Sequence, residues 1–314
     1  MAYTNMDTNM TTSSALSAGM QTYYNRELLR TFEPNLVHLQ FGDEHRMPPH
    51  SGLVMNMRKL IPLETNTKAL SEGDPGESVM LAETEVTVQL QQYGEYARCT
   101  DKLDLTHLDM DIMRRTKLFG DAGARSIDAV VREELAKCAN VIYAGGKASR
   151  AELTAADKLT SRELRKAVKT LKKNHAQTFG GYYVAIIGPD TMYDLQEDEA
   201  FVKVSQYQDK ENIYTGEVGR LFGVRLVETT EAKIFEGAGA SGADVASVIV
   251  LGQYAYGVTS LKGAKPRVIV KPAGSAGTAD PLDQISTVGW KMDGFGAKLL
   301  QPEYAVRIEC GFSA

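Results

Sequence analysis

Two strand-like runs, Val54–Leu63 and Thr84–Thr100, flank a polar segment that is richest in turn-forming residues at Ser71–Glu77. Apolar side chains take every second position over part of the later run: Val86, Val88 and Leu90. One face of that run is therefore apolar and the other polar, and the two runs predict a long β-hairpin. Two strands alone are marginally stable in water, so the apolar face needs another surface to cover it. A neighbouring subunit is the natural source of that surface, and we expect the chain to self-assemble.

A long helix is predicted over Thr106–Ala144, with a glycine pair after it as the stop signal. Its first residues resemble a capping box, and an apolar stripe follows at helical spacing. Acid-to-base pairs at four-residue spacing would each add about 0.2–0.5 kcal/mol. These pairs are Asp111–Arg115, Asp121–Arg125, Asp128–Arg132 and Glu133–Lys137. Gly120 and Gly123 each cost about 1 kcal/mol relative to alanine in a helix, so a bend or a break is expected near them.

Helices and strands alternate after the long helix. Thr160, with Glu163 three residues later, predicts a capped helix that runs to Lys173. A short helix is expected near Thr191–Asp198. Strands are expected at Tyr182–Ile187, Val224–Glu228, Val245–Leu251 and Val268–Lys271. This region predicts one compact α/β subdomain, while long strands between Val288 and Gly311 would return to the long helix.

The composition is that of an ordinary globular protein, with 314 residues of which 43% are hydrophobic and 24% charged. The net charge of -5 provides no overall field that attracts nucleic acid, although local basic patches are compatible with it. No window approaches the roughly 18 apolar residues of a membrane span. Met1–Met20 lacks the basic start and apolar run of a secretory signal. We therefore expect a protein that is made and kept in a cytoplasm, without membrane contact.

Three cysteines, Cys99, Cys138 and Cys310, are far apart and odd in number. This pattern fits neither a disulfide framework nor a paired zinc motif, so we expect reduced, buried side chains. The segment Gly237–Gly242 satisfies the G-x-G-x-x-G pattern of dinucleotide sites, which need a helix to start at the third glycine. The β-branched run Ala246–Leu251 follows instead, and the glycines are interpreted as a hairpin loop.

An acidic cluster with one imidazole lies just before the long helix. Its members are Asp101, Asp104, His107, Asp109 and Asp111. Oxygen-rich clusters bind hard cations, but this spacing lacks the glycine and distal glutamate of an EF-hand loop. Carboxylates are also favoured in the first turn of a helix. The chain's histidines have no Ser or Cys nucleophile in a recognisable local signature. We expect no catalytic site, no cofactor and no metal.

Four further segments are informative in their order and spacing. They are Gln91–Tyr96, Gly181–Asp190, Gly216–Arg220 running into Gly223–Arg225, and Pro272–Lys291 with the chain's single tryptophan. In these segments the chain resembles the major capsid proteins of tailed bacteriophages. The resemblance covers roughly Gly52 to Gly311 and is most specific in the C-terminal half.

The resemblance implies an α+β fold of the Hong-Kong-97 type, with an N-terminal arm, an extended β-hairpin loop, a long spine helix, and peripheral and axial domains. By this resemblance, residues 1–51 are the arm, 52–101 the extended loop, 102–159 the spine helix and part of the peripheral domain, 160–272 the axial domain, and 273–314 the return strands of the peripheral domain. It also implies close backbone packing around Gly274 and Gly277, near the junction of the two domains.

The function implied is structural. Such proteins form the hexamers and pentamers of an icosahedral shell around double-stranded DNA, and the chain would be synthesised and assembled in the host cytoplasm and reside in the virion capsid. A separate scaffolding protein, a portal protein and non-specifically bound DNA are the implied partners. Mixed charges on the loop suit pairing across a subunit boundary. The candidate assembly contacts are Arg58, Lys59, Glu64, Lys68, Glu72, Asp74 and Glu77. Two alternatives remain open: an encapsulin-like compartment shell, and a nucleotide-dependent enzyme that uses Gly237–Gly242.

Overall fold

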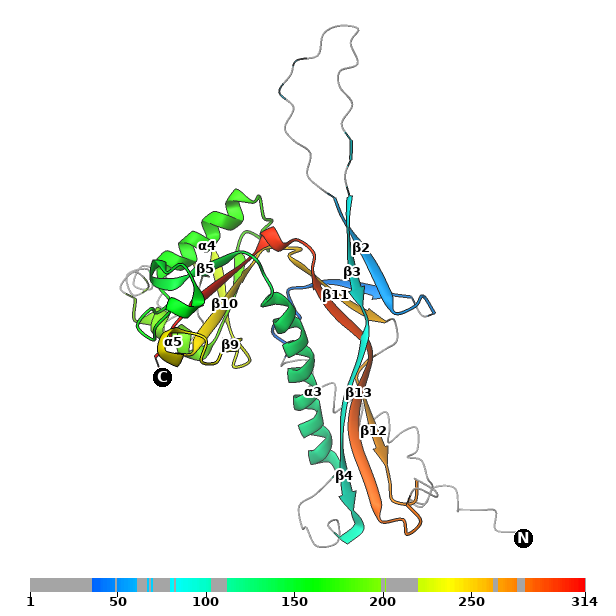
Figure 1. The fold of residues 1–314 in the computed structure, drawn as a ribbon. Coiled ribbons are helices and arrows are strands. Elements are labelled where there is room, and N and C mark those ends of the chain that lie inside the picture. Colours follow the sequence, from blue (N-terminus) through cyan, green and yellow to red (C-terminus); the bar gives the residue numbers. More distant parts are fainter. Residues whose placement is uncertain are drawn as a thin grey trace, which may run out of the picture.

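The computed structural model describes residues 36–48, 50–60, 67, 69, 80–81, 83–102, 112–198, 201, 220–261, 265–275 and 280–313. The described strands form two main sheets and a projecting hairpin, with a long helix beside one of the sheets (Figure 1). We call the sheet that contains strand β10 (Val245–Leu251) the compact sheet, and the sheet that contains strand β13 (Ile285–Leu299) the long sheet.

The compact sheet has seven strands among the described residues. Six of them follow the order β5 (Val141–Tyr143), β14 (Ala305–Cys310), β10, β6 (Tyr183–Ile187), β8 (Val224–Glu228) and β7 (Arg220–Leu221), and β9 (Ile234–Phe235) pairs with β10. Every residue of β6 and β10 is buried, as expected of strands that are covered on both faces. Helices α4 (Ser161–Lys173) and α5 (Pro189–Gln196) pack on one face, and the other face adjoins the long helix and the long sheet.

The long sheet is organised around β13 and has five strands among the described residues. Strand β4 (Gln91–Thr100) pairs along one edge of β13. Strands β12 (Arg267–Lys271) and β11 (Tyr256–Leu261) pair along the other edge, and β1 (Asp43–Met47) lies parallel to β11. Helix α3 (Ile112–Leu135) covers one face of this sheet. The chain then passes from β13 into β14, which joins the two sheets.

Short 3-10 helices connect several of these elements. They are η2 (Ala144–Gly146), η3 (Arg150–Glu152), η4 (Ala240–Gly242) and η6 (Pro302–Tyr304). The helix α4 begins after Thr160 and ends at Lys173, as the capping residues predict. The predicted bounds of β8 and β10 are also confirmed, and those of β6 and β12 differ by one residue at the start.

Strands β2 (Val54–Leu60) and β3 (Glu83–Gln89) form the antiparallel arms of the hairpin, which projects beyond the long sheet (Figure 1). The prediction of one strand from Thr84 to Thr100 is wrong, because the run divides at Leu90. The N–H of Leu90 donates to the carbonyl of Leu53 at 2.8 Å, and the chain then leaves β2 to pair with β13. Alternating apolar residues predict a strand, but they do not identify its partner.

The long helix is shorter at its C-terminal end than predicted. Helix α3 is continuous across Gly120 and Gly123, so the break expected there does not occur, and its 24 residues span about 36 Å. It ends at Leu135 and not at Ala144. Val141–Tyr143 instead forms β5 beside β14, because β-branched and aromatic residues favour a strand when a partner edge is available. The predicted capping pair, Thr106 and Asp109, lies outside the described residues.

The two sheets do not follow the division at residue 272 that the resemblance implied. β11 and β12 precede that residue but belong to the long sheet, and β14 follows it but lies inside the compact sheet between β5 and β10. These pairings join residues far apart in the chain, which local patterns do not encode. The turn at Gly274 is also not near the junction of the sheets. It connects β12 to the end of β13 that pairs with Thr100, whereas the opposite end of β13 leads to β14 (Figure 1).

Candidate assembly interface

The base of the β2–β3 hairpin is fixed to the subunit's own long sheet. Met57, Val88 and Leu90 are buried there. Two glycines permit this close approach: a Cβ on Gly257 would lie 3.0 Å from the sulfur of Met57, and one on Gly296 would lie 2.9 Å from Cγ1 of Val88. The expectation that the apolar face of the hairpin has no cover within the subunit is therefore wrong at its base.

Two of the seven candidate assembly contacts, Arg58 and Lys59, lie among the described residues. The ammonium of Lys59 is 2.7 Å from a carboxylate oxygen of Glu303, and this hydrogen bond lowers the pKa of Glu303. Arg58 lies 3.6 Å from Glu83 on the opposite strand, with both side chains exposed. Lys59 is thus engaged within the subunit, whereas Arg58 faces solvent. The other five, Glu64, Lys68, Glu72, Asp74 and Glu77, lie outside the described residues.

Further along the hairpin, large apolar side chains face solvent. Met80 and Leu81 are 90% and 75% exposed, and Leu53 and Val54 are exposed near the base. Contiguous exposed apolar surface is typical of an interaction site. The assembly contacts predicted from the sequence in this region are all charged. The apolar signal was present in Met80 and Leu81, which lie three and four residues after the turn-rich stretch Ser71–Glu77.

The face of the long sheet that is not covered by α3 carries a groove of about 640 Å³. Tyr96 of β4, Gly289 of β13 and Ile269 of β12 are directly opposite one another in the strand register. Opposite residues of antiparallel strands point to the same face, so Tyr96 and Ile269 flank Gly289. A Cβ on Gly289 would lie 2.7 Å from that of Tyr96 and 2.5 Å from the carbonyl oxygen of Glu95. The floor of the groove therefore requires glycine at this position.

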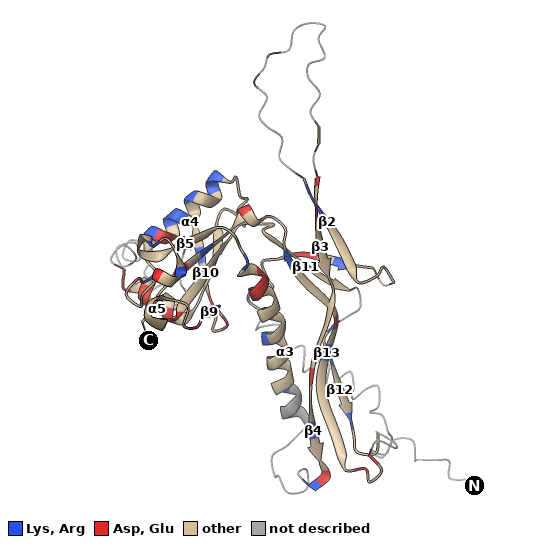
Figure 2. Ribbon diagram, viewed as in Figure 1, with Lys and Arg blue, Asp and Glu red and all other residues tan. Residues whose placement is uncertain are grey.

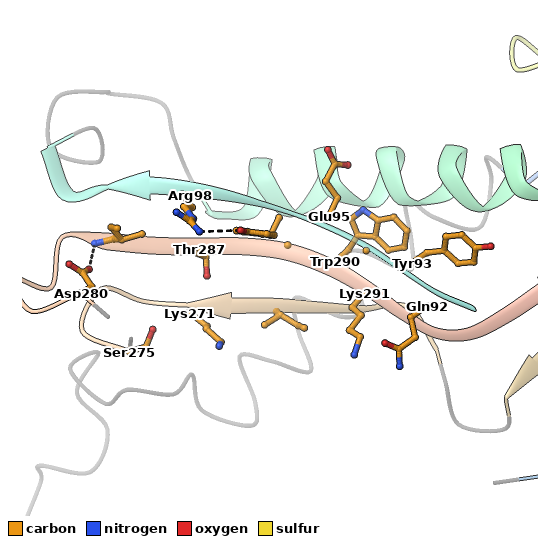
Figure 3. Close-up of a pocket in the computed structure, with 15 residues that line it drawn as sticks. Gln92, Tyr93, Glu95, Arg98, Lys271, Ser275, Asp280, Thr287, Trp290 and Lys291 are labelled. Atoms are coloured by element: carbon orange, nitrogen blue, oxygen red, sulfur yellow. Dashed lines mark hydrogen bonds between the residues drawn. The ribbon is translucent and has the colours of Figure 1, made fainter. Parts of the chain in front are cut away.

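Cations border this apolar floor. Thr287, in the neighbouring row of β13, lies between Arg98 of β4 and Lys271 of β12, and Lys291 lines the groove on the other side. Figure 3 shows Lys271 and Lys291 on the side of the strands away from α3, with Trp290 toward that helix. The groove thus combines exposed apolar side chains with positively charged groups.

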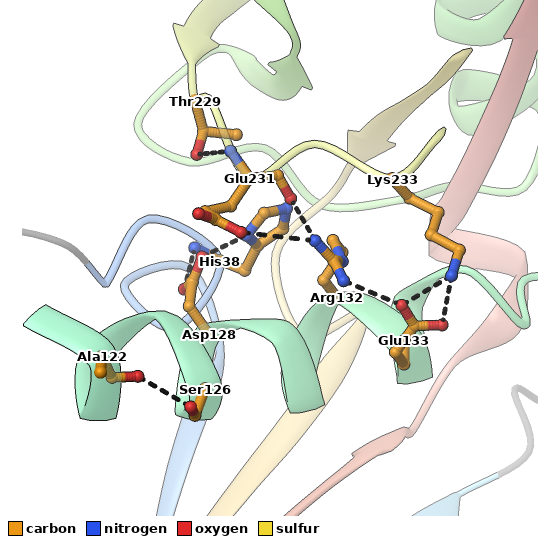
Figure 4. A network of polar contacts seen from close by, with 9 residues as sticks. All are labelled: His38, Ala122, Ser126, Asp128, Arg132, Glu133, Thr229, Glu231 and Lys233. Carbon is orange, nitrogen blue, oxygen red and sulfur yellow. Dashed lines mark hydrogen bonds and ion pairs between the residues drawn. The ribbon is translucent and has the colours of Figure 1, made fainter. Parts of the chain in front are cut away.

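A buried polar network holds the segment before β1 against α3 (Figure 4). The backbone N–H of His38 donates to one carboxylate oxygen of Asp128 at 2.7 Å, and its Nδ1 lies 2.5 Å from the other. Tyr256 of β11 donates from its hydroxyl to the carbonyl oxygen of His38. Burial, together with the charge of Asp128, raises the pKa of Tyr256 and keeps its proton in place. Asp128 therefore fixes the N-terminal segment.

The next turn of α3 contacts the segment between β8 and β9. Arg132 donates to the carbonyl oxygen of Glu231 at 2.9 Å, and the carboxylate of Glu133 accepts from Lys233 at 2.7 Å (Figure 4). Burial alone would raise the pKa of Glu133, but hydrogen bonds from Lys233 and Arg132 lower it. These contacts join the two sheets through α3. Asp128 and Glu133 thus bind partners from distant segments, His38 and Lys233, and not the residues predicted one turn along the helix.

Within the described part of the chain, no three His, Cys, Asp or Glu side chains are grouped so that they could hold a metal ion. Of the acidic cluster only Asp101 is described, and it accepts a hydrogen bond from the N–H of Lys102. The cysteines are free and buried, as predicted, and burial raises the pKa of Cys310 to about 12. No helix in the described part of the chain is long and apolar enough to cross a membrane.

The glycine-rich segment Gly237–Gly242 joins β9 to β10, which are antiparallel, so the prediction of a hairpin loop is confirmed. Gly239 has an ordinary negative φ, but a Cβ there would lie 2.7 Å from the carbonyl oxygen of Leu153 and 2.9 Å from that of Ala243. The glycine at this position permits close backbone packing, and no helix starts at the third glycine as a dinucleotide site requires.

Residues 83–308, more than half of the chain, match the model of a family described as phage capsid protein. Comparison with curated proteins gives no match. Among solved structures, the capsid of Ralstonia phage GP4 has a TM-score of 0.67 at 14% identity, and the match covers 100% of this chain and 98% of that one. The capsid of cyanophage P-SCSP1u has a TM-score of 0.65 at 16% identity, with 87% of each chain covered.

A virus-like particle from Pyrococcus furiosus also matches, with a TM-score of 0.55, 12% identity, and coverage of 92% of this chain and 99% of that one. The fold alone therefore does not distinguish a phage capsid from another kind of particle, whereas the family match does. The expected α+β fold of the Hong-Kong-97 type and the structural role are confirmed. The chain belongs to the phage capsid protein family, and it is a major capsid protein that self-assembles as the structural subunit of an icosahedral phage capsid.

Proposed function

We propose that this capsid protein assembles, without catalysis, by extending its β2–β3 hairpin onto the long sheet of a second copy. The observation that carries the proposal is the exposure of two large apolar side chains of the hairpin, Met80 and Leu81, to solvent. The groove around Gly289 is the receiving surface, since Tyr96 and Ile269 offer apolar area that is also exposed.

Charge supports the same pairing. Residues 61–79 carry four acidic side chains, Glu64, Glu72, Asp74 and Glu77, against one basic side chain, Lys68. Among the residues that line the groove, the cations Arg98, Lys271 and Lys291 outnumber the carboxylates of Glu95 and Asp280. Complementary charge of this kind sets register and partner choice more than affinity. The acidic residues of the tip, together with Arg58 at its base, are therefore the proposed assembly contacts, while Lys59 stabilises the hairpin base through Glu303.

A hairpin that docks into a groove on the next copy forms a heterologous contact, which closes into a ring when the rotation between copies allows it. Each copy then donates one hairpin and receives another. Weak contacts are sufficient because simultaneous engagement multiplies their effect. Hexamers and pentamers are the rings that the proposal requires.

Within this assembly, residues 1–51 act as the arm, the hairpin as the extended loop and α3 as the spine helix. The long sheet forms the peripheral domain and the compact sheet the axial domain. A separate scaffolding protein, a portal protein and non-specifically bound DNA are the further partners, with assembly in the host cytoplasm. These assignments are supported by the family to which the chain belongs.

The test is a deletion of residues 69–80 from the full chain. Loop shortening changes closure entropy little, and the described residues of this stretch, Ala69 and Met80, are exposed. The subunit should therefore keep its thermal unfolding transition while losing the ability to form shells. Sedimentation velocity and electron microscopy measure assembly, and calorimetry measures folding. Normal shells from the deletion variant would refute the role of the hairpin, and an unfolded subunit would show that the tip belongs to the core.

A matched pair of point variants locates the receiving surface. Tyr96→Ala removes an exposed groove residue, whereas Tyr193→Ala removes a similarly exposed tyrosine from α5. The first should raise the protein concentration needed for assembly and the second should not. Equal effects of the two substitutions would exclude the groove as the receiving surface.

A further inference from the structure

The solvent-facing side of α4 consists of cations. Its exposed residues are Arg162, Arg165, Lys169, Lys172 and Lys173, and Lys166 is half-buried between them. The apolar residues of the helix, Leu164, Ala167, Val168 and Leu171, are all buried against the compact sheet. Figure 2 shows this basic helix on the outside of the domain. A positively charged patch therefore lies on the surface of a chain whose net charge is -5.

Most of these cations have no acidic partner among the described residues. Lys166 lies 3.6 Å from Glu163, and the guanidinium of Arg165 lies over the ring of Phe222. Arg162, Lys169, Lys172 and Lys173 form no ion pair within the described part of the chain. These groups are consequently available to a negatively charged partner.

Helix stability accounts for only part of this pattern. Lys172 and Lys173 lie in the last turn, where cations interact favourably with the helix dipole. Arg162 lies in the first turn, where the same dipole is unfavourable to a positive charge. The stability of the isolated helix therefore does not explain the presence of Arg162 in the first turn.

The geometry suits an extended line of phosphates. From residue 162 to residue 173 the helix rises about 16 Å, which is close to half a turn of duplex DNA. Guanidinium and ammonium groups are both effective partners of phosphate. Interfaces with duplex DNA are polar and positively charged, whereas the core of a protein interface is apolar and depleted of charge. The exposed face of α4 offers no apolar side chain for such a core.

We propose that the cationic face of α4 binds the phosphate backbone of duplex nucleic acid without reading its sequence, and that this face lines the interior of the shell. The inference rests on the proposed function, in which DNA is the packaged partner. Because the overall charge of the chain is negative, binding comes from this local patch and is strongly dependent on salt.

The first experiment compares two full-length triple variants that each remove three positive charges. One is Lys169→Gln, Lys172→Gln and Lys173→Gln in α4. The control is Arg46→Gln, Lys117→Gln and Arg267→Gln, which are also exposed but lie on β1, α3 and β12. Unassembled subunits are titrated with a random-sequence duplex over a range of salt concentrations, and fluorescence anisotropy reports binding.

Each phosphate contact contributes roughly 0.9 to the slope of log affinity against log salt. The α4 variant should reduce that slope by up to about 3 and weaken binding at low salt at least tenfold, while the control should match the unmodified chain. Equal losses in both variants would show an effect of net charge and overturn the proposal, as would no loss in either. If the α4 variant binds DNA normally but forms no shells, α4 contacts another copy of the chain, and the proposal is also overturned.

The second experiment tests the interior placement. The three native cysteines are buried, so Lys172→Cys provides a single accessible thiol. A maleimide coupled to a large polyethylene glycol should label it in dissociated subunits but not in intact shells. Labelling of intact shells would place α4 outside and refute the proposal. A chain that forms no shells would contradict the proposed function, while the DNA titration of subunits still tests the binding face by itself.

Discussion

The compact sheet is covered on both faces, whereas the long sheet is covered by α3 on one face and has no described element over the groove on the other. The difference is visible in two isoleucines on strands. Ile187 of β6 is buried between the sheet and its helices, and Ile269 of β12 is 37% exposed at the floor of the groove. The first region completes its core within one subunit, whereas the second leaves apolar surface exposed.

This contrast separates folding from assembly within one chain. Substitutions in the compact sheet should act on the free energy of unfolding, and those in the groove or hairpin should act on association between subunits. The experiments that test this separation begin with the largest expected effect on folding and end with the smallest.

The largest effect is expected for Ile187→Ala. Removing a fully buried isoleucine deletes packing contacts and leaves a cavity, which costs about 2–5 kcal/mol. Ile269→Ala makes the same chemical change at the groove and should cost less than about 1 kcal/mol, since its side chain already contacts solvent. Denaturant unfolding of the two variants measures the difference. Equal losses in the free energy of unfolding would mean that the core of the long sheet, like that of the compact sheet, is completed within one subunit.

Gly239→Ala should destabilise the compact sheet by about 1–3 kcal/mol, because the new Cβ is forced against two carbonyl oxygens and the backbone has to shift. Ala238→Ser, at the preceding half-buried position, is the control and should change stability little. Thermal unfolding measures both. A Gly239→Ala variant that is as stable as the unmodified chain would show that the loop moves aside easily. A rise in the unfolding temperature of the unmodified chain on addition of NAD or ATP would support the alternative of a nucleotide-dependent enzyme.

The carboxylate of Asp194 in α5 joins the C-terminal segment to the compact sheet. It accepts from the N–H and hydroxyl of Ser313 and lies 2.9 Å from the ammonium of Lys158. Burial alone would raise the pKa of Asp194, but the bonds from Ser313 and Lys158 lower it below its ordinary value. A lowered pKa in the folded state means that the stabilisation is complete above about pH 4 and disappears as the pH falls through the folded-state value.

Asp194→Asn should therefore cost about 1.5–3 kcal/mol at neutral pH, and the difference from the unmodified chain should shrink below about pH 4. Urea unfolding between pH 7 and pH 2.5 provides the measurement. A difference that stays constant across this range would mean that the charge of Asp194 does not contribute, so that only its shape matters.

The smallest effect on folding is expected for Arg58→Gln, which removes one member of an exposed pair with Glu83. Exposed ion pairs contribute about 0–1 kcal/mol, so the unfolding midpoint should hardly move. Assembly kinetics followed by light scattering should nevertheless slow and lose part of their salt dependence. Unchanged assembly kinetics would show that Arg58 does not contribute to the interface, and the contact would then depend on the apolar residues.

Local structure was predictable where short-range chemistry decides it. Thr160 and Glu163 mark the start of α4, and the apolar run at Val245–Leu251 predicts β10 at its observed bounds. Pairing between distant segments was not predictable, because side-chain periodicity does not specify a strand's partner. The division at Leu90 and the insertion of β14 into the compact sheet both depend on such pairing.

The candidate interface could likewise be predicted from the sequence only in part. A polar tip between two strands predicted a projecting hairpin, and the described arms confirm it. The groove was not predictable, because Tyr96, Gly289 and Ile269 come together only through the register of three strands. The bond between His38 and Asp128 likewise joins residues 90 positions apart, whereas the sequence suggested a partner one helical turn away.

The course of β13 has a mechanical consequence. This strand of 15 residues is hydrogen-bonded along both edges and leads through the short helix η6 to β14, so a single stretch of backbone connects the tip of one sheet to the interior of the other. Tension along this stretch loads its flanking hydrogen bonds in shear, and many of them must break together before the strand slides. A subunit stretched by pressure from within a filled shell would therefore yield last along this line.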